Sequence, residues 1–83
     1  MEETNLMHDR NHAELRRIGL DLKAKRVAAD LTQEQLIAMS KGELKQGTLS
    51  AIEKGSYNVG VRPLMVYARL LGYKITFVPD DRQ

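Results

Sequence analysis

Apolar residues recur at helical spacing over most of the chain. Between residues 12 and 29 they form two stripes, Leu15, Ile18, Leu22 and Leu20, Ala24, Val27. Residues three or four positions apart share one face of a helix, so the pattern predicts a first helix over residues 12–29. Two stripes indicate burial on two sides, one in the core and one against a partner. Gly19 lies in the middle, where it either permits a close crossing or is merely tolerated.

Polar residues mark the start and the end of a short second helix. Thr32 and Gln35 have the spacing of a capping box, which satisfies backbone N–H groups at a helix start. We therefore expect a helix from Thr32 that stops by residues 40–42. Its apolar positions are Leu36, Ile37 and Met39.

A polar linker around Leu44 leads to a third helix near residues 46–54. Leu49 and Ile52 are expected to point inward. Gly55 lies just after the helix, a position that glycine commonly occupies. The pattern thus predicts two short helices joined by a turn.

A fourth helix is expected over residues 61–71. Pro63 falls in its first turn, where a missing N–H costs little, and Gly72 ends it. The positions predicted to face inward are Val61, Leu64, Met65, Ala68 and Leu71.

The residues that follow alternate in a strand period. Tyr73, Ile75 and Phe77 would lie on one face, with Val78 on the other. The sequence offers no second strand to pair with them. A lone strand must fray, pack as an extended tail, or pair with another chain.

Size and composition indicate one small helical domain. The chain has 83 residues and no cysteine, and no apolar run approaches the ~20 residues that span a membrane. We expect a flexible segment at 1–11, a domain of four or five helices at 12–72, and a strand and tail at 73–83. His8 and His12 have the spacing of a metal pair on a helix, but no third ligand lies nearby. We therefore expect no bound metal. We also expect no cofactor and no membrane partner, and we expect the protein to be cytoplasmic.

Charge is distributed unevenly along the chain. Residues 10–74 hold twelve Lys or Arg against six acids, although the whole chain has a net charge of only +2. A basic body suits a polyanion, because neutralised phosphates release counterions. A merely solvated charged surface remains the alternative.

Two sequence blocks carry a family resemblance. LTQEQL at residues 31–36, followed by QGTLSAIEKG at 46–55, resembles the Cro/phage-repressor (XRE-type) helix-turn-helix family. The resemblance extends over residues 15–72 and implies a lambda-repressor-like fold that binds double-stranded DNA.

The resemblance also implies a role for individual residues. Gln33 would touch a backbone phosphate, and Gln46 would reach a base edge, braced by Gln33; an amide can pair with adenine N6 and N7. Arg26 and Glu53 match a structural pair in which the first helix holds the recognition helix. The full set expected at DNA is Gln33, Lys45, Gln46, Gly47, Thr48, Ser50, Ala51, Lys54, Asn58 and Arg62.

The sequence departs from the family pattern in four places. The turn before Gln46 is two residues longer than usual, Lys45 replaces the usual Ser or Thr cap, and Lys25 stands where an apolar residue is common. Gly47 and Ala51 offer little side chain, so base reading would rest on Gln46 and its neighbours and on DNA shape.

The C-terminal residues resemble a subset of the family that includes HipB-like antitoxin regulators. This resemblance implies that Tyr73, Ile75, Phe77 and Val78 form a strand that pairs with its two-fold mate in a homodimer. The expected function is a repressor or autoregulator on a palindromic operator, without catalysis. The alternative is an antitoxin that neutralises a toxin protein. An RNA-binding role is disfavoured by the scarcity of aromatic residues.

Overall fold

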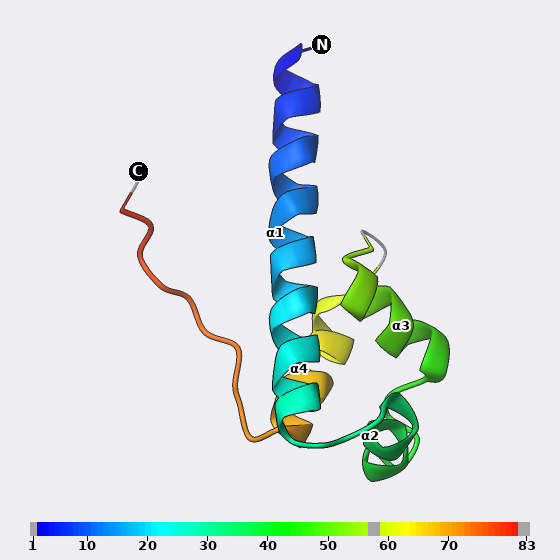
Figure 1. The fold of residues 1–83 in the computed structure, drawn as a ribbon. Coiled ribbons are helices and arrows are strands. Elements are labelled where there is room, and N and C mark those ends of the chain that lie inside the picture. Colours follow the sequence, from blue (N-terminus) through cyan, green and yellow to red (C-terminus); the bar gives the residue numbers. More distant parts are fainter. Residues whose placement is uncertain (1, 57–58, 82–83) are drawn as a thin grey trace.

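The part of the chain that the structure describes contains four helices and an extended C-terminal segment. The computed structural model describes residues 2–56 and 59–81, with side chains described from Asn11 onward. The helices are α1 (Glu2–Ala28), α2 (Gln33–Met39), α3 (Gln46–Lys54) and α4 (Val61–Leu70). Figure 1 shows α1 as a long rod, with the other three helices gathered around its C-terminal half. Within the described residues, no helix combines the length and the apolar character needed to cross a bilayer.

The two short helices lie where the sequence predicts them. At the start of α2, the Gln35 N–H donates to Thr32 Oγ1 at 3.1 Å and the Thr32 N–H donates to Gln35 Oε1 at 2.8 Å. This reciprocal pair confirms the capping box. Helix α3 ends at Lys54, and the capping residue Gly55 has a φ of 76°, which glycine adopts at little cost.

Helix α1 begins earlier than predicted. It starts at Glu2, so the segment expected to be flexible lies within the helix from that residue onward. The sequence has no glycine or proline between residues 2 and 18. Once a helix has nucleated, each further residue adds a hydrogen bond at small cost, so nothing local ends it there.

Two glycines let α1 pack directly on α3. A Cβ at Gly19 would overlap the carbonyl oxygen of Ile52, and a Cβ at Gly55 would come within 2.6 Å of the Cα of Arg16. Gly19 therefore permits a close crossing, the first of the two readings that the sequence left open.

The core is formed by side chains from all four helices and from the turn between α2 and α3. Its buried hydrophobic members are Leu22, Leu36, Leu44, Leu49, Ile52, Val66, Tyr67 and Ala68. The inward positions expected on α2 and α3 are confirmed for Leu36, Leu49 and Ile52, whereas Met39 is 45% exposed.

The predicted inward face of α4 was partly wrong. Val61 and Met65 are exposed, whereas Val66 and Tyr67 are buried. Compared with the predicted orientation, α4 is turned about its axis, and the hydroxyl of Tyr67 reaches the buried carboxylate of Glu53 on α3.

The lengthened turn between α2 and α3 is an ordered structure. Lys41 and Gly42 both have positive φ, and Leu44 is fully buried beneath them. The Ser40 hydroxyl donates to the Ile37 carbonyl at 2.7 Å and accepts the Leu44 N–H at 3.0 Å. The two extra residues thus let Leu44 enter the core before α3 begins.

The C-terminal segment is extended and does not form the predicted strand. Residues 73–80, all described, are in neither helix nor strand, and their side chains are exposed. Tyr73 lies against α1, with its ring centroid 4.8 Å from Lys25 Nζ. A ladder needs a second strand, and the described part of this chain supplies none.

Candidate nucleic-acid interface

One side of α3 faces away from the core. Leu49, Ile52 and Glu53 are buried. The opposite face carries Gln46, Gly47, Ser50, Ala51 and Lys54, at the i, i+1, i+4, i+5 and i+8 spacing of a single helical face. This face holds small, polar and basic residues and no acid.

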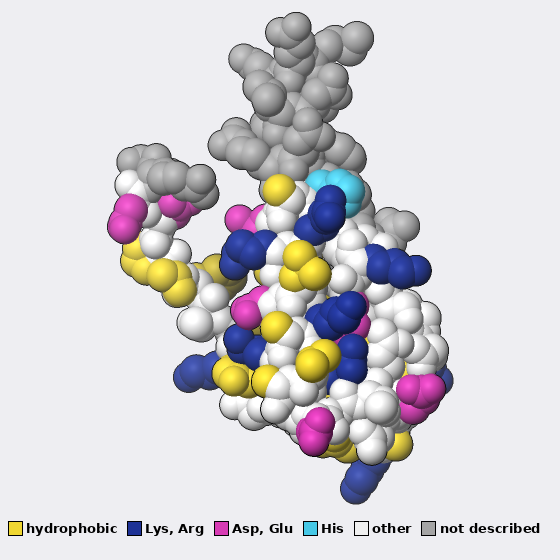
Figure 2. All heavy atoms as spheres, in the orientation of Figure 1, with side chains coloured by type: hydrophobic (Ala, Val, Ile, Leu, Met, Phe, Trp, Pro, Cys, Tyr) yellow, Lys and Arg dark blue, Asp and Glu magenta, His cyan; other side chains and the backbone are white. Residues whose placement is uncertain are grey.

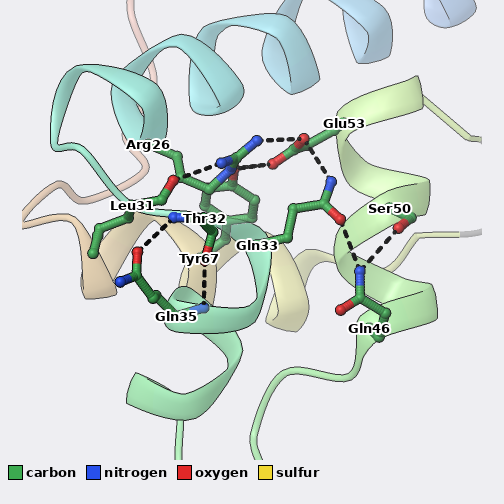
Figure 3. A network of polar contacts seen from close by, with 9 residues as sticks. All are labelled: Arg26, Leu31, Thr32, Gln33, Gln35, Gln46, Ser50, Glu53 and Tyr67. Atoms are coloured by element: carbon green, nitrogen blue, oxygen red, sulfur yellow. Dashed lines mark hydrogen bonds and ion pairs between the residues drawn. The ribbon is translucent and has the colours of Figure 1, made fainter.

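Gln46, at the start of α3, is held by a hydrogen bond to α2. Its Nε2 donates to Gln33 Oε1 at 2.8 Å and lies 3.4 Å from Ser50 Oγ (Figure 3). Gln33 is the first residue of α2, where its side chain is half-buried. The structure therefore brings Gln33, Gln46 and Ser50 together at one end of the α3 face.

Gln33 is in turn fixed by Glu53. Its Nε2 donates to Glu53 Oε1 at 3.0 Å. Arg26 donates to the same carboxylate through Nε at 2.8 Å and Nη2 at 3.2 Å, and the Tyr67 hydroxyl donates at 2.5 Å. One carboxylate thus links α1, α2, α3 and α4 (Figure 3).

The network keeps Glu53 ionised. Burial opposes the charged carboxylate, but the hydrogen bonds from Arg26, Tyr67 and Gln33 outweigh it and lower the pKa of Glu53. Burial and the adjacent carboxylate raise the pKa of Tyr67, so its hydroxyl remains a donor. Arg26 also donates to the Leu31 carbonyl at 2.6 Å, which fixes the chain just before α2.

Tyr67 is the residue of this network that the sequence analysis missed. Its position was readable, because Leu64, Tyr67, Ala68 and Leu71 follow the i, i+3, i+4, i+7 pattern of a buried face. The Arg26–Glu53 pair, in contrast, was expected from the family resemblance.

The other residues expected at DNA lie around α3. Lys45 is the exposed N-cap of that helix and makes no side-chain cap bond. Arg62 is exposed in the first turn of α4, and Thr48 is half-buried. Asn58 lies outside the described residues.

Two short helices across a turn, with an exposed and tethered second helix, define a helix-turn-helix DNA-binding domain. A helix-turn-helix family model matches residues 22–78, more than half of the chain. The chain belongs to the Cro/phage-repressor (XRE-type) helix-turn-helix family and is a DNA-binding regulator. No curated protein and no solved structure gives a significant match to it.

Proposed function

We propose that this protein is a sequence-specific regulator that binds a palindromic operator as a homodimer and acts as a repressor or autoregulator. The observation that carries the proposal is the tethering of Gln46 on an exposed, acid-free helix face. Its work is binding, without catalysis.

The proposed interface places α3 in the major groove. Gln46 contacts a base edge, and Gln33 contacts a phosphate while it braces Gln46. Lys45, Lys54 and Arg62 are exposed cations that can approach phosphates on either side. Short side chains along the groove add further contacts, from Gly47, Thr48, Ser50 and Ala51. Asn58 completes the proposed set.

Selection of bound sequences from random duplex DNA tests this function. We expect an enriched palindrome with half-sites about one helical turn apart. Gln46→Ala should then weaken operator binding by about 1–3 kcal/mol and leave binding to random duplex nearly unchanged. Equal losses on both DNAs would show that Gln46 does not read a base, and selection without enrichment would refute sequence-specific binding.

The proposed homodimer is built by the C-terminal segment. Phe77 is 98% exposed and Val78 is 78% exposed, and within the described part of the chain no backbone–backbone hydrogen bond involves residues 74–78. Antiparallel pairing with a two-fold mate would satisfy these groups and cover the apolar side chains. The surface for this ribbon would be the second stripe of α1, where Leu20 and Val27 are exposed.

A second candidate function is neutralisation of a toxin protein. The same exposed segment favours it, because an apolar tail can equally bind a different chain. A toxin gene adjacent to the gene for this protein, and a complex between the two products, would support this role.

A further inference from the structure

Helix α1 extends beyond the part of the chain that the family model covers. The model matches residues 22–78, whereas α1 begins at Glu2. Figure 1 shows the N-terminal half of α1 passing the C-terminal end of α3 and continuing beyond it. The residues of α1 before Leu22 therefore add a surface beside α3 that lies outside the matched family region.

A cleft of about 340 Å³ lies between this part of α1 and the end of α3. The stem of Arg16 packs on Gly55, where an added Cβ would come within 2.6 Å of the Arg16 Cγ. This packing places Arg16 beside Lys54, the last residue of α3. The cleft, called here the α1–α3 cleft, is lined by His12, Arg16, Leu20, Glu53 and Lys54.

The α1–α3 cleft carries positive charge. Arg16 and Lys54 are both exposed, and within the described residues no acid forms an ion pair with either of them. Glu53 also lines the cleft, but its carboxylate is only 9% exposed and is paired with Arg26 at 2.8 Å. The two exposed cations are therefore not neutralised by the acid beside them.

The cleft continues the α3 face proposed for DNA. Gln46 begins α3 and Lys54 ends it, so about 12 Å separates them along the helix axis, at ~1.5 Å per residue. The major groove is about 12 Å wide. With Gln46 at a base edge, the cleft at the other end of α3 therefore falls at the phosphate backbone that borders the groove.

We propose that the α1–α3 cleft binds a phosphate of the DNA backbone beside the base pairs contacted by α3, and that Arg16 donates to this phosphate together with Lys54. A guanidinium suits the ligand, because it donates two parallel hydrogen bonds to phosphate oxygens. The inference rests on the proposed function, because it adds an anchoring contact to the same complex. The competing role for Arg16 is structural, since a cation near the end of α3 also stabilises the negative pole of that helix.

The salt dependence of DNA binding separates these two roles. Arg16→Met keeps an apolar stem on Gly55 and removes the charge. Loss of one phosphate contact should reduce the slope of log binding constant against log salt concentration by about 0.9. It should weaken binding about ten-fold at low salt, the order of one hydrogen bond, on operator and random duplex alike. A structural role alone would lower the thermal midpoint and leave the slope unchanged.

Arg17→Met is the matched control. It removes the same charge from the next residue, which is exposed, lies about 100° further around α1 and does not line the cleft. The control should keep the wild-type slope, and thermal unfolding should show both variants folded. Lys54→Met, which probes the cleft from α3, should reduce the slope as Arg16→Met does. Equal reductions in the Arg16 and Arg17 variants would reveal a diffuse charge effect and overturn the inference.

Neutral methylphosphonates placed singly in a selected operator locate the contact. At one flanking position the substitution should weaken wild-type binding about ten-fold and change the binding of Arg16→Met little, because the contact is already lost. If no position behaves in this way, Arg16 holds no phosphate and the inference is overturned while the proposed function stands. Failure to select any operator would refute the proposed function, whereas the slopes on random duplex would still test the cleft.

Discussion

The carboxylate of Glu53 connects the stability of the fold to the arrangement of the interface. It accepts hydrogen bonds from Arg26, Gln33 and Tyr67, three residues on three other helices. A buried carboxylate is expensive unless donors surround it. Within the described residues, no buried side-chain nitrogen or oxygen lacks a partner, so this cost is offset.

The Arg26–Glu53 pair should be strongly coupled. Arg26→Met or Glu53→Leu alone leaves the other charge buried, and each should lower the free energy of unfolding by about 3–5 kcal/mol. The double variant should recover much of that loss, because neither charge remains. Denaturant unfolding of the four proteins gives the coupling energy. Simple addition of the two single losses would contradict the pairing.

Tyr67 should make the protein sensitive to alkaline pH. Its pKa is raised above the ordinary 10.0, because burial and the neighbouring Glu53 disfavour the phenolate. The unfolded chain therefore loses this proton first, and the stability that Tyr67 provides is complete below pH 10 and falls as the pH rises further. Unfolding measured from pH 8 to 11 should show this fall. Tyr67→Phe should start less stable and have a flatter profile in that range; identical slopes would argue against the shift.

At the scale of elements, the position of α3 is set by how closely α1 approaches it. Gly19 and Gly55 remove the side chains that would separate the two backbones. The Arg26–Glu53 contact of 2.8 Å depends on the same approach, since both residues lie on this pair of helices. The close packing of α1 on α3 therefore also sets the geometry of the site.

Alanine substitutions at two glycines should have opposite effects. Gly19→Ala would drive a Cβ into the backbone of α3 and should destabilise the fold by about 2–3 kcal/mol. At Gly47 a Cβ would meet nothing, so Gly47→Ala should stabilise α3 by about 0.5–1 kcal/mol. Thermal unfolding compares the two, and a neutral Gly19→Ala would show that the crossing can relax.

At the scale of the whole molecule, apolar side chains remain on the surface after the core is complete. Figure 2 shows yellow side chains in a broken line along α1, flanked by Lys and Arg, and again on the C-terminal segment. Leu20, Val27 and Phe77 are each more than half exposed. Surfaces of this kind are typical of a protein–protein interface.

Deletion of residues 73–83 should therefore produce a monomer. The truncated chain should be less stable and should lose operator binding far beyond the effect of one base contact, because a half-site alone binds weakly. Sedimentation of the full chain and the truncation measures the change. A truncation that remains dimeric would place the interface on the helices and leave the C-terminal segment as a tail.

Local sequence signals were enough to predict the two central helices, α2 and α3. The capping box at Thr32 and Gln35, the apolar pair Leu49 and Ile52, and Gly55 together predicted α2 and α3, because each acts within a few residues. The start of α1 was missed, since the weak apolar period of its first residues gave no reason to extend the helix. A periodic pattern indicates which face of a helix is buried, but the length of the helix also depends on where a glycine or proline ends it.

The sequence alone determined the helix-turn-helix blocks and the family to which the chain belongs. Tertiary structure decided the features that join distant residues: Tyr67 on Glu53, Leu44 in the core beneath the turn, and the direction of the amides from Glu53 to Gln46. Helix propensity and capping act over one or two turns and can be read along the chain. Which group the Tyr67 hydroxyl meets, and which way an amide points, depends on partners brought together only when the helices pack.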